Sequence, residues 1–130
     1  MCIRDSKNRF YLVQSDLFSE IYSPAKLDFI VSNPPYLPSD KIADLQTEVS
    51  QFEPRNALDG GKDGLFFYRY LLGAALGMLK RDGKIILEIG FDQQPALNKL
   101  LNRFPAWESS NFLPDLKENF RVWILGKETN

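Results

Sequence analysis

Residues 27–36 read Leu-Asp-Phe-Ile-Val-Ser-Asn-Pro-Pro-Tyr and combine an apolar strand with an abrupt strand end. The run over 28–32 is almost continuously apolar, which is typical of a strand covered on both faces. The two prolines end it, because neither can donate a backbone N–H to a sheet. Proline also favours an extended conformation in the residue before it, so we expect Asn33 to sit at the tip of the strand.

The four residues at this strand end have the groups needed to hold a planar NH2 group. The amide oxygen of Asn33 and the carbonyl oxygen of Pro34 can accept its two hydrogens, while the ring of Tyr36 can stack on its face. Pro35 keeps the backbone stiff. The alternative interpretation is an Asn-Pro turn that only ends a strand and is followed by a chance second proline.

The rest of the chain alternates between strand-like and helix-like patterns. We predict strands over 9–13, 28–32, 84–89, 107–112 and 120–125, helices over 65–79 and 93–104, and a long functional loop over 37–64 with a helical turn near 42–46. This alternation predicts an α/β fold with a mainly parallel sheet, in which ligands bind beyond the C-terminal ends of the strands. The last two strands are separated by about seven residues, too few for a helical crossover, so they should be antiparallel.

A series of further short motifs accompanies the Asn-Pro-Pro-Tyr sequence. They are Gln-Ser-Asp-Leu-Phe at 14–18, Phe-Glu-Pro-Arg-Asn-Ala-Leu-Asp-Gly-Gly-Lys-Asp-Gly-Leu at 52–65 with Tyr68, Leu-Glu-Ile-Gly at 87–90, Asp-Leu at 115–116 and Arg-Val at 121–122. In this order the series resembles the glutamine methyltransferases of peptide chain release factors, over about residues 9–126. The resemblance implies a Rossmann-like class I methyltransferase sheet, mainly parallel with an antiparallel strand near the C-terminus.

The resemblance also implies an activity and roles for individual residues. The reaction would transfer a methyl group from S-adenosylmethionine to the side-chain amide nitrogen of the glutamine in the Gly-Gly-Gln loop of a release factor. Asn33 and Pro34 would be catalytic, and Asn33, Pro34, Pro35 and Tyr36 would bind the substrate. Asp16, Leu17 and Asn33 would bind the cofactor, with Asp16 accepting a hydrogen bond from the adenine amino group. A helix N-cap is the other interpretation of Asp16.

Several features of the family do not appear in this chain. None of its eight glycines forms a Gly-x-Gly turn between a strand and a helix, and the acidic residue expected to hold the ribose is absent. We therefore expect the isolated chain to bind S-adenosylmethionine weakly or not at all and to be inactive. We read residues 1–8 as a foreign or disordered start, and 9–130 as the C-terminal part of a catalytic domain truncated at its N-terminus. Glu118 replaces an expected glycine, which puts the local turn in doubt.

Some other residues have structural rather than functional interpretations. We expect Glu53 to fasten the loop, and Glu88 either to pair with a basic side chain or to lie near the site, because an unpaired carboxylate in an apolar strand is costly. Arg121 is expected to pair with a carboxylate. The aromatic residues at helical spacing are expected to be core: Phe66, Phe67, Tyr68 and Tyr70.

Strand order has a consequence for the sheet edge. In the family, strands that precede the 28–32 strand cover its edge. We expect 28–32, 84–89, 120–125 and 107–112 to be adjacent in that order, with 107–112 at the far edge. The 28–32 strand then borders a vacancy, so either 9–13 pairs with it or the isolated chain self-associates through this edge.

Composition narrows the classes of function. The net charge is −1 with no basic block, which disfavours direct nucleic-acid binding. The chain has no histidine and one cysteine, Cys2, so we expect no metal site of the cysteine-histidine type. No membrane span or signal peptide is visible, so we expect a cytoplasmic location. Two alternatives stay open: an enzyme that methylates a nucleobase amino group (adenine N6 type), and a catalytically silent α/β domain.

Overall fold

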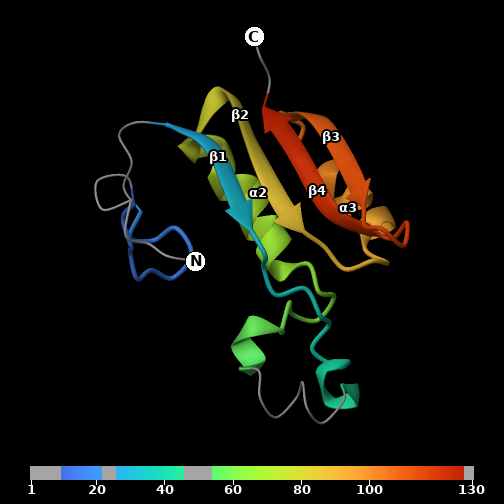
Figure 1. Ribbon diagram of the computed structural model, residues 1–130. Helices are drawn as coiled ribbons and strands as arrows, with labels where there is room; N and C mark the ends of the chain where they lie inside the picture. The colour runs from blue at the N-terminus through green and yellow to red at the C-terminus, as the bar shows by residue number, and fades with distance from the viewer. Residues whose placement is uncertain (1–9, 22–25, 46–53, 128–130) are drawn as a thin grey trace.

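The computed structural model describes residues 10–21, 26–45 and 54–127. In chain order the elements are β1 (Leu27–Ser32), η2 (Ile42–Asp44), η3 (Arg55–Ala57), α2 (Phe66–Met78), β2 (Leu79–Glu88), α3 (Gln94–Leu101), β3 (Trp107–Pro114) and β4 (Phe120–Lys127) (Figure 1). The predicted helices and the last four predicted strands are all present in this part of the chain. The interpretation of residues 1–8 falls outside the described residues.

The four strands form one mixed sheet in the order β1-β2-β4-β3. This confirms the expected strand order, with β3 at the far edge. β1 is parallel to β2, and β4 is antiparallel to both β2 and β3. The expectation of a mainly parallel sheet is therefore wrong for the described residues. The short connection between β3 and β4 forces an antiparallel pair, and no further parallel strand is described beyond β1.

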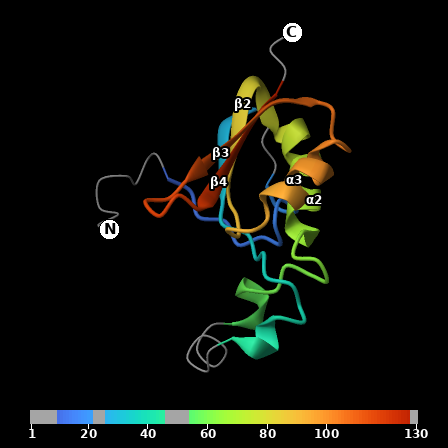
Figure 2. The same cartoon turned by 90° about the vertical axis from the view of Figure 1, so that its right-hand side faces the viewer.

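Both α-helices pack on the same face of this sheet (Figure 2). The core between the two layers is formed by apolar side chains, of which Tyr68, Leu72, Ile85, Leu87, Leu97, Trp123 and Leu125 are fully buried. β1 contributes Ile30 to this core, but Phe29 is 61% and Val31 is 73% exposed. The prediction that β1 is buried on both faces is thus wrong, because no described helix covers the second face.

β2 begins earlier than predicted. Leu79 ends α2 in an extended conformation and is already the first residue of β2, so residues 81–83 lie in the strand instead of closing the helix. Between the pairs Leu27–Leu79 and Phe29–Lys84 the register shifts, so this end of β2 is irregular. Gly83 fits there because a Cβ atom would lie only 3.0 Å from the carbonyl oxygen of Lys80.

Residues 10–13 do not form the strand that was predicted, and all four are exposed. They make no pairing with β1, whose described partner is β2 alone. The pairing predicted for residues 9–13 is therefore not formed by the described residues. Within the part of the chain that the structure describes, the outer edge of β1 stays open.

The turn between β3 and β4 forms despite the glutamate at position 118. Glu118 has a φ of 63°, the left-handed conformation that favours glycine. Oδ1 of Asp115 accepts hydrogen bonds from the backbone N–H groups of Lys117, at 2.8 Å, and Asn119, at 3.1 Å. These bonds hold the turn in a conformation that glutamate alone disfavours.

Among the described residues, no helix is both long and apolar enough to cross a membrane. In the same residues, no group of three or more aspartate, glutamate, cysteine or histidine side chains is placed to hold a metal ion.

The open edge of β1 leads to a testable expectation. We expect the chain to self-associate through β1, because an unpaired edge beside exposed apolar side chains is a template for another strand. Val31→Lys should shift the sedimentation profile toward the monomer, since a lysine on an edge strand opposes such pairing. Phe66→Lys, at an exposed position on α2, is the matched control and should leave the profile unchanged. A monomeric unsubstituted chain at high concentration would contradict this expectation.

Candidate functional site

The candidate site lies where β1 and β2 end side by side. The two strands are parallel, so their C-terminal ends meet at one edge of the sheet (Figure 1). Residues 33–36 continue from β1 and Gly90 follows the end of β2. This is the edge at which ligands bind in open α/β sheets.

The long loop folds back onto the Asn-Pro-Pro-Tyr segment. Leu37 N–H donates to the carbonyl of Leu58 at 3.1 Å, and Gly60 N–H donates to the carbonyl of Leu37 at 2.8 Å. Ser39 N–H donates to the carbonyl of Gly61 at 3.0 Å. The helical turn expected in this loop is present as η2. The loop therefore pairs by backbone hydrogen bonds with the residues immediately after the motif.

Two glycines of the loop allow this close approach. A Cβ atom at Gly60 would lie 2.7 Å from Cα of Tyr36, closer than side-chain carbons are found in proteins. Gly64 has a φ of +72°, and a Cβ atom there would overlap the carbonyl oxygen of Tyr36. Both positions therefore favour glycine for the same physical reason: the loop contacts the backbone of Tyr36 at each of them.

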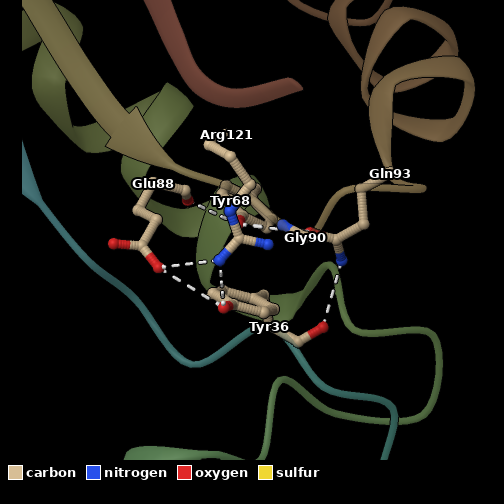
Figure 3. Close-up of polar contacts among 6 residues, drawn as sticks. All are labelled: Tyr36, Tyr68, Glu88, Gly90, Gln93 and Arg121. Atoms are coloured by element: carbon tan, nitrogen blue, oxygen red, sulfur yellow. Dashed lines mark hydrogen bonds and ion pairs between the residues drawn. The ribbon is translucent and has the colours of Figure 1, made fainter. Parts of the chain in front are cut away.

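The hydroxyl end of Tyr36 is held by an ion pair (Figure 3). Nη2 of Arg121 donates to this hydroxyl at 3.3 Å, and the hydroxyl donates to Oε1 of Glu88 at 3.4 Å. Arg121 and Glu88 also pair with each other at 3.5 Å. The expected pairing of Glu88 with a basic side chain is confirmed, and so is that of Arg121 with a carboxylate. Both residues also lie at the site, because they contact Tyr36.

The carbonyl end of Tyr36 is held by the buried carboxamide of Gln93 (Figure 3). Nε2 of Gln93 donates to the carbonyl oxygens of Tyr36, at 3.0 Å, and Gly64, at 3.2 Å. Oε1 of Gln93 accepts from Gly90 N–H at 2.8 Å and lies 3.3 Å from the hydroxyl of Tyr68. One side chain therefore joins the motif, the loop, the end of β2 and α2.

Sequence reasoning missed Gln93. It stands beside a second glutamine, Gln94, and nothing in the sequence distinguishes a buried amide from an exposed one. The sequence showed only that Gln93 lies three residues after Gly90 and at the start of the predicted helix, which places it near the strand end but does not show that it is buried.

Tyr68 is core, as predicted, but two of its aromatic neighbours are not. Tyr68 is fully buried, and its hydroxyl donates to the carbonyl of Glu88 at 2.8 Å. Burial is the main cause that raises the pKa of Tyr68 above its usual value. Phe66 is 57% exposed and Tyr70 is 39% exposed, so their prediction as core residues is wrong. They lie on the outer side of α2.

The residues predicted to bind substrate come together around a cavity of about 200 Å³. Its lining is Asn33, Pro34, Pro35, Tyr36, Leu37, Ala57 and Leu58. Pro34 is buried, whereas Asn33 is exposed at the tip of β1. The amide of Asn33 has no hydrogen-bond partner among the described residues. It is therefore free to bind a ligand in this cavity.

The structure does not bring Asp16 and Leu17 into that cavity. Both lie in the turn over 16–20, where Leu17 has a φ of 55°. Oγ of Ser15, and not Asp16, accepts the backbone N–H of Glu20 at 3.0 Å. The N-cap interpretation of Asp16 is wrong for the described residues, because the segment is a turn and no helix begins there. The predicted role of Glu53 lies outside the described residues.

A carboxylate in the loop fixes the backbone close to the motif. Oδ1 of Asp59 accepts from Oγ of Ser39 at 2.6 Å and from Gly61 N–H at 2.9 Å, and Arg55 lies 3.4 Å from its other oxygen. The hydrogen bond from Ser39 is the largest cause that lowers the pKa of Asp59, followed by that from Gly61. Asp59 thus links the segment after the motif, at Ser39, to the loop at Gly61.

The chain is similar in sequence to several named proteins. No family model matches the chain. Proteins named release factor glutamine methyltransferase are 43% identical over 116 residues in Moorella thermoacetica, 41% over 122 residues in Caulobacter vibrioides and 39% over 127 residues in Thermodesulfovibrio yellowstonii. These matches cover 89%, 94% and 96% of this chain. The resemblance predicted from the motifs is thus confirmed over most of the chain.

The chain spans less than half the length of these relatives, namely 40%, 41% and 44%. Among solved structures, a crystal structure of a methyltransferase from Pyrococcus furiosus matches with a TM-score of 0.53 and 24% identity. That match covers 82% of this chain and 43% of the other. At this identity the match shows a shared fold.

The Gln93 carboxamide is expected to be a major source of stability for the site. Gln93→Leu removes the partners of two carbonyl groups and of the Gly90 N–H, so urea unfolding should show a loss of about 2–5 kcal/mol. Gln94→Leu, at the next position, is the matched control and should change stability by less than about 0.5 kcal/mol. Equal effects of the two substitutions would contradict the role given to Gln93.

The Asp59 carboxyl is expected to titrate in a way that depends on Ser39. Ser39→Ala should raise the pKa of Asp59 toward its usual value of about 3.9 in an NMR titration. Because folding lowers this pKa, the contribution to stability is complete above about pH 4 and is lost as the pH falls through the lowered value. Asp63 is the internal control, since its pKa is lowered mainly by Arg69. An unchanged Asp59 titration would contradict this assignment.

Proposed function

We propose that Asn33 and Pro34 bind the side-chain amide of a glutamine so that its nitrogen can be methylated. The proposed substrate is the glutamine of the Gly-Gly-Gln loop in a peptide chain release factor, and the proposed methyl donor is S-adenosylmethionine. The observation that carries this proposal is the exposed amide of Asn33 in the cavity at the end of β1, which has no hydrogen-bond partner among the described residues. The names of the relatives support the choice of substrate.

The chemistry of an amide nitrogen explains why such a site is needed. Its lone pair is delocalised into the carbonyl group, so it is a poor nucleophile. If Oδ1 of Asn33 and the carbonyl oxygen of Pro34 accept both N–H groups, the nitrogen is turned so that its lone pair points away from them. No base is needed before attack, because the nitrogen proton becomes acidic once the nitrogen is alkylated. When bound, S-adenosylmethionine supplies a methyl group on a positively charged sulfur.

Placement of the substrate amide relative to the methyl donor then accounts for the rate of methyl transfer. Correct placement of two reactants can contribute about 7–11 kcal/mol. In this protein the placement is supplied by stiff parts: two consecutive prolines, and a tyrosine held at its hydroxyl by Arg121 and Glu88 and at its carbonyl by Gln93. The fixed ring of Tyr36 offers a flat surface on which the substrate amide can stack.

The residues proposed to bind the cofactor do not all line one cavity. Of the three residues proposed to bind it, Asn33 lines the 200 Å³ cavity, whereas Asp16 and Leu17 line none of the cavities described. We keep Asp16 as the proposed acceptor for the adenine amino group, by resemblance. We also propose that residues 9–130 are the C-terminal part of a class I methyltransferase catalytic domain, which the shared fold supports.

The charge distribution favours a protein substrate over a nucleobase in a nucleic acid. The net charge is −1, so a basic track for a phosphate backbone is not supported by composition. An assay that offers both a release factor and duplex DNA to the full-length protein that carries this sequence distinguishes the two. Methylation of DNA alone would overturn the proposal.

The proposed role of Asn33 is tested by substitution in the same full-length protein. Asn33→Ala should lower turnover of the release-factor glutamine by about a hundred- to a thousand-fold, since it removes an interaction needed in the transition state. Cofactor affinity should stay nearly intact. Tyr36→Phe keeps the ring and should cost less than about ten-fold, because it removes only long hydrogen bonds. Turnover of the Asn33 variant within a few-fold of the unsubstituted protein would refute the role.

A further inference from the structure

A second and larger cavity, of about 480 Å³, lies against the same tyrosine. It shares Tyr36 and Leu37 with the cavity that contains Asn33, so the two cavities are neighbours along this segment of backbone. Its other walls come from the start of the loop, the residues before α2, the end of β2 and β4. Of these walls, the methylation chemistry proposed above uses only Arg121 and Gln93, which hold Tyr36.

We propose that this second cavity binds the residues of the substrate polypeptide that flank the glutamine. This inference rests on the proposed function. A glutamine that occupies the smaller cavity belongs to a polypeptide that must continue beyond it, and the larger cavity is the neighbouring one, lined by the same Tyr36 and Leu37. Its volume lies in the range of about 300–1,000 Å³ that is typical of ligand-binding pockets.

The apolar part of the lining indicates what kind of side chain fits. Leu37, Pro38, Leu65 and Ala96 form apolar walls, and Phe91 stands among them with 64% of its surface exposed. An exposed aromatic side chain in a concave wall becomes covered when an apolar group enters. The cavity therefore suits a peptide that places an apolar side chain against Phe91.

The charged part of the lining favours an uncharged ligand over a polyanion. Lys41 and Arg121 are balanced by Asp63 and Asp92, so the cavity as a whole has no excess of positive charge. Only Nη2 of Arg121 is used in its bonds to Tyr36 and Glu88. The remaining N–H groups of this side chain make no hydrogen bond to another described residue, and peptide carbonyl groups can accept them. An uncharged peptide backbone matches this pattern better than a phosphate backbone does.

The network around Tyr36 fixes the distance between the two cavities. Its hydroxyl contacts residues of β2 and β4, and its carbonyl contacts the residue before α3. A peptide seated against Phe91 would therefore place the next part of its chain at a defined point relative to Asn33. The larger cavity would select the sequence around the glutamine, while the smaller one holds the reacting amide.

The test compares two synthetic peptides with blocked ends, bound without any methyl donor. One contains Gly-Gly-Gln with several flanking residues of a release factor on each side, and the other contains Gly-Gly-Gln alone. Phe91→Ala should weaken binding of the long peptide by about ten-fold in titration calorimetry and leave the short one unchanged. Asn33→Ala should weaken both. Phe66→Ala, at an exposed aromatic position outside the cavity, is the matched control and should weaken neither.

The Phe91 and Asn33 substitutions distinguish failure of this inference from failure of the proposed function. If Phe91→Ala binds both peptides as the unsubstituted protein does while Asn33→Ala weakens both, the inference is overturned and the proposed function stands. If Asn33→Ala changes neither affinity, or if neither peptide binds the unsubstituted protein, the proposed function falls and the inference falls with it. Because Phe91 is largely exposed, its replacement should leave the fold intact, and an unchanged urea unfolding curve verifies this.

Discussion

The fixed position of Tyr36 is the constraint on which the rest of the site depends. Its carbonyl is bound by a buried carboxamide whose other bonds reach the loop, the end of β2 and α2. Its hydroxyl is bound between a glutamate of β2 and an arginine of β4. Buried polar groups are costly unless all are satisfied, so this network has few alternative arrangements. The position of Tyr36 is therefore determined by residues along the whole sheet edge, and not by the Asn-Pro-Pro-Tyr motif alone.

This constraint also explains why distant motifs resemble one family together. Asn-Pro-Pro-Tyr places the tyrosine, Gly60 and Gly64 leave room for the loop against its backbone, and Glu88 with Arg121 receives its hydroxyl. Each motif contributes one side of a single packing arrangement.

The sequence predicted both helices and the antiparallel last strand, because hydrophobic periodicity and connection length are local properties, whereas the strand order was expected from the resemblance to the family. It also predicted the pairing of Glu88 and the position of Asn33. The sequence-based prediction failed where strand pairing or burial depends on which other segment packs against the residue. Residues 10–13 look like a strand but pair with nothing described, and Phe29 and Val31 look buried but are exposed. Gln93 was missed because burial of one amide is decided by tertiary contacts.

The turn between β3 and β4 has a consequence for how this chain tolerates substitution over evolutionary time. A left-handed conformation costs a residue other than glycine about 1–2 kcal/mol, and here Glu118 adopts it while Asp115 binds the turn's backbone. Positions 115 and 118 are therefore epistatic. With glycine at position 118, substitution of Asp115 would cost less stability than it does with glutamate at position 118. A descendant lineage would be expected to lose the aspartate only after it regains the glycine.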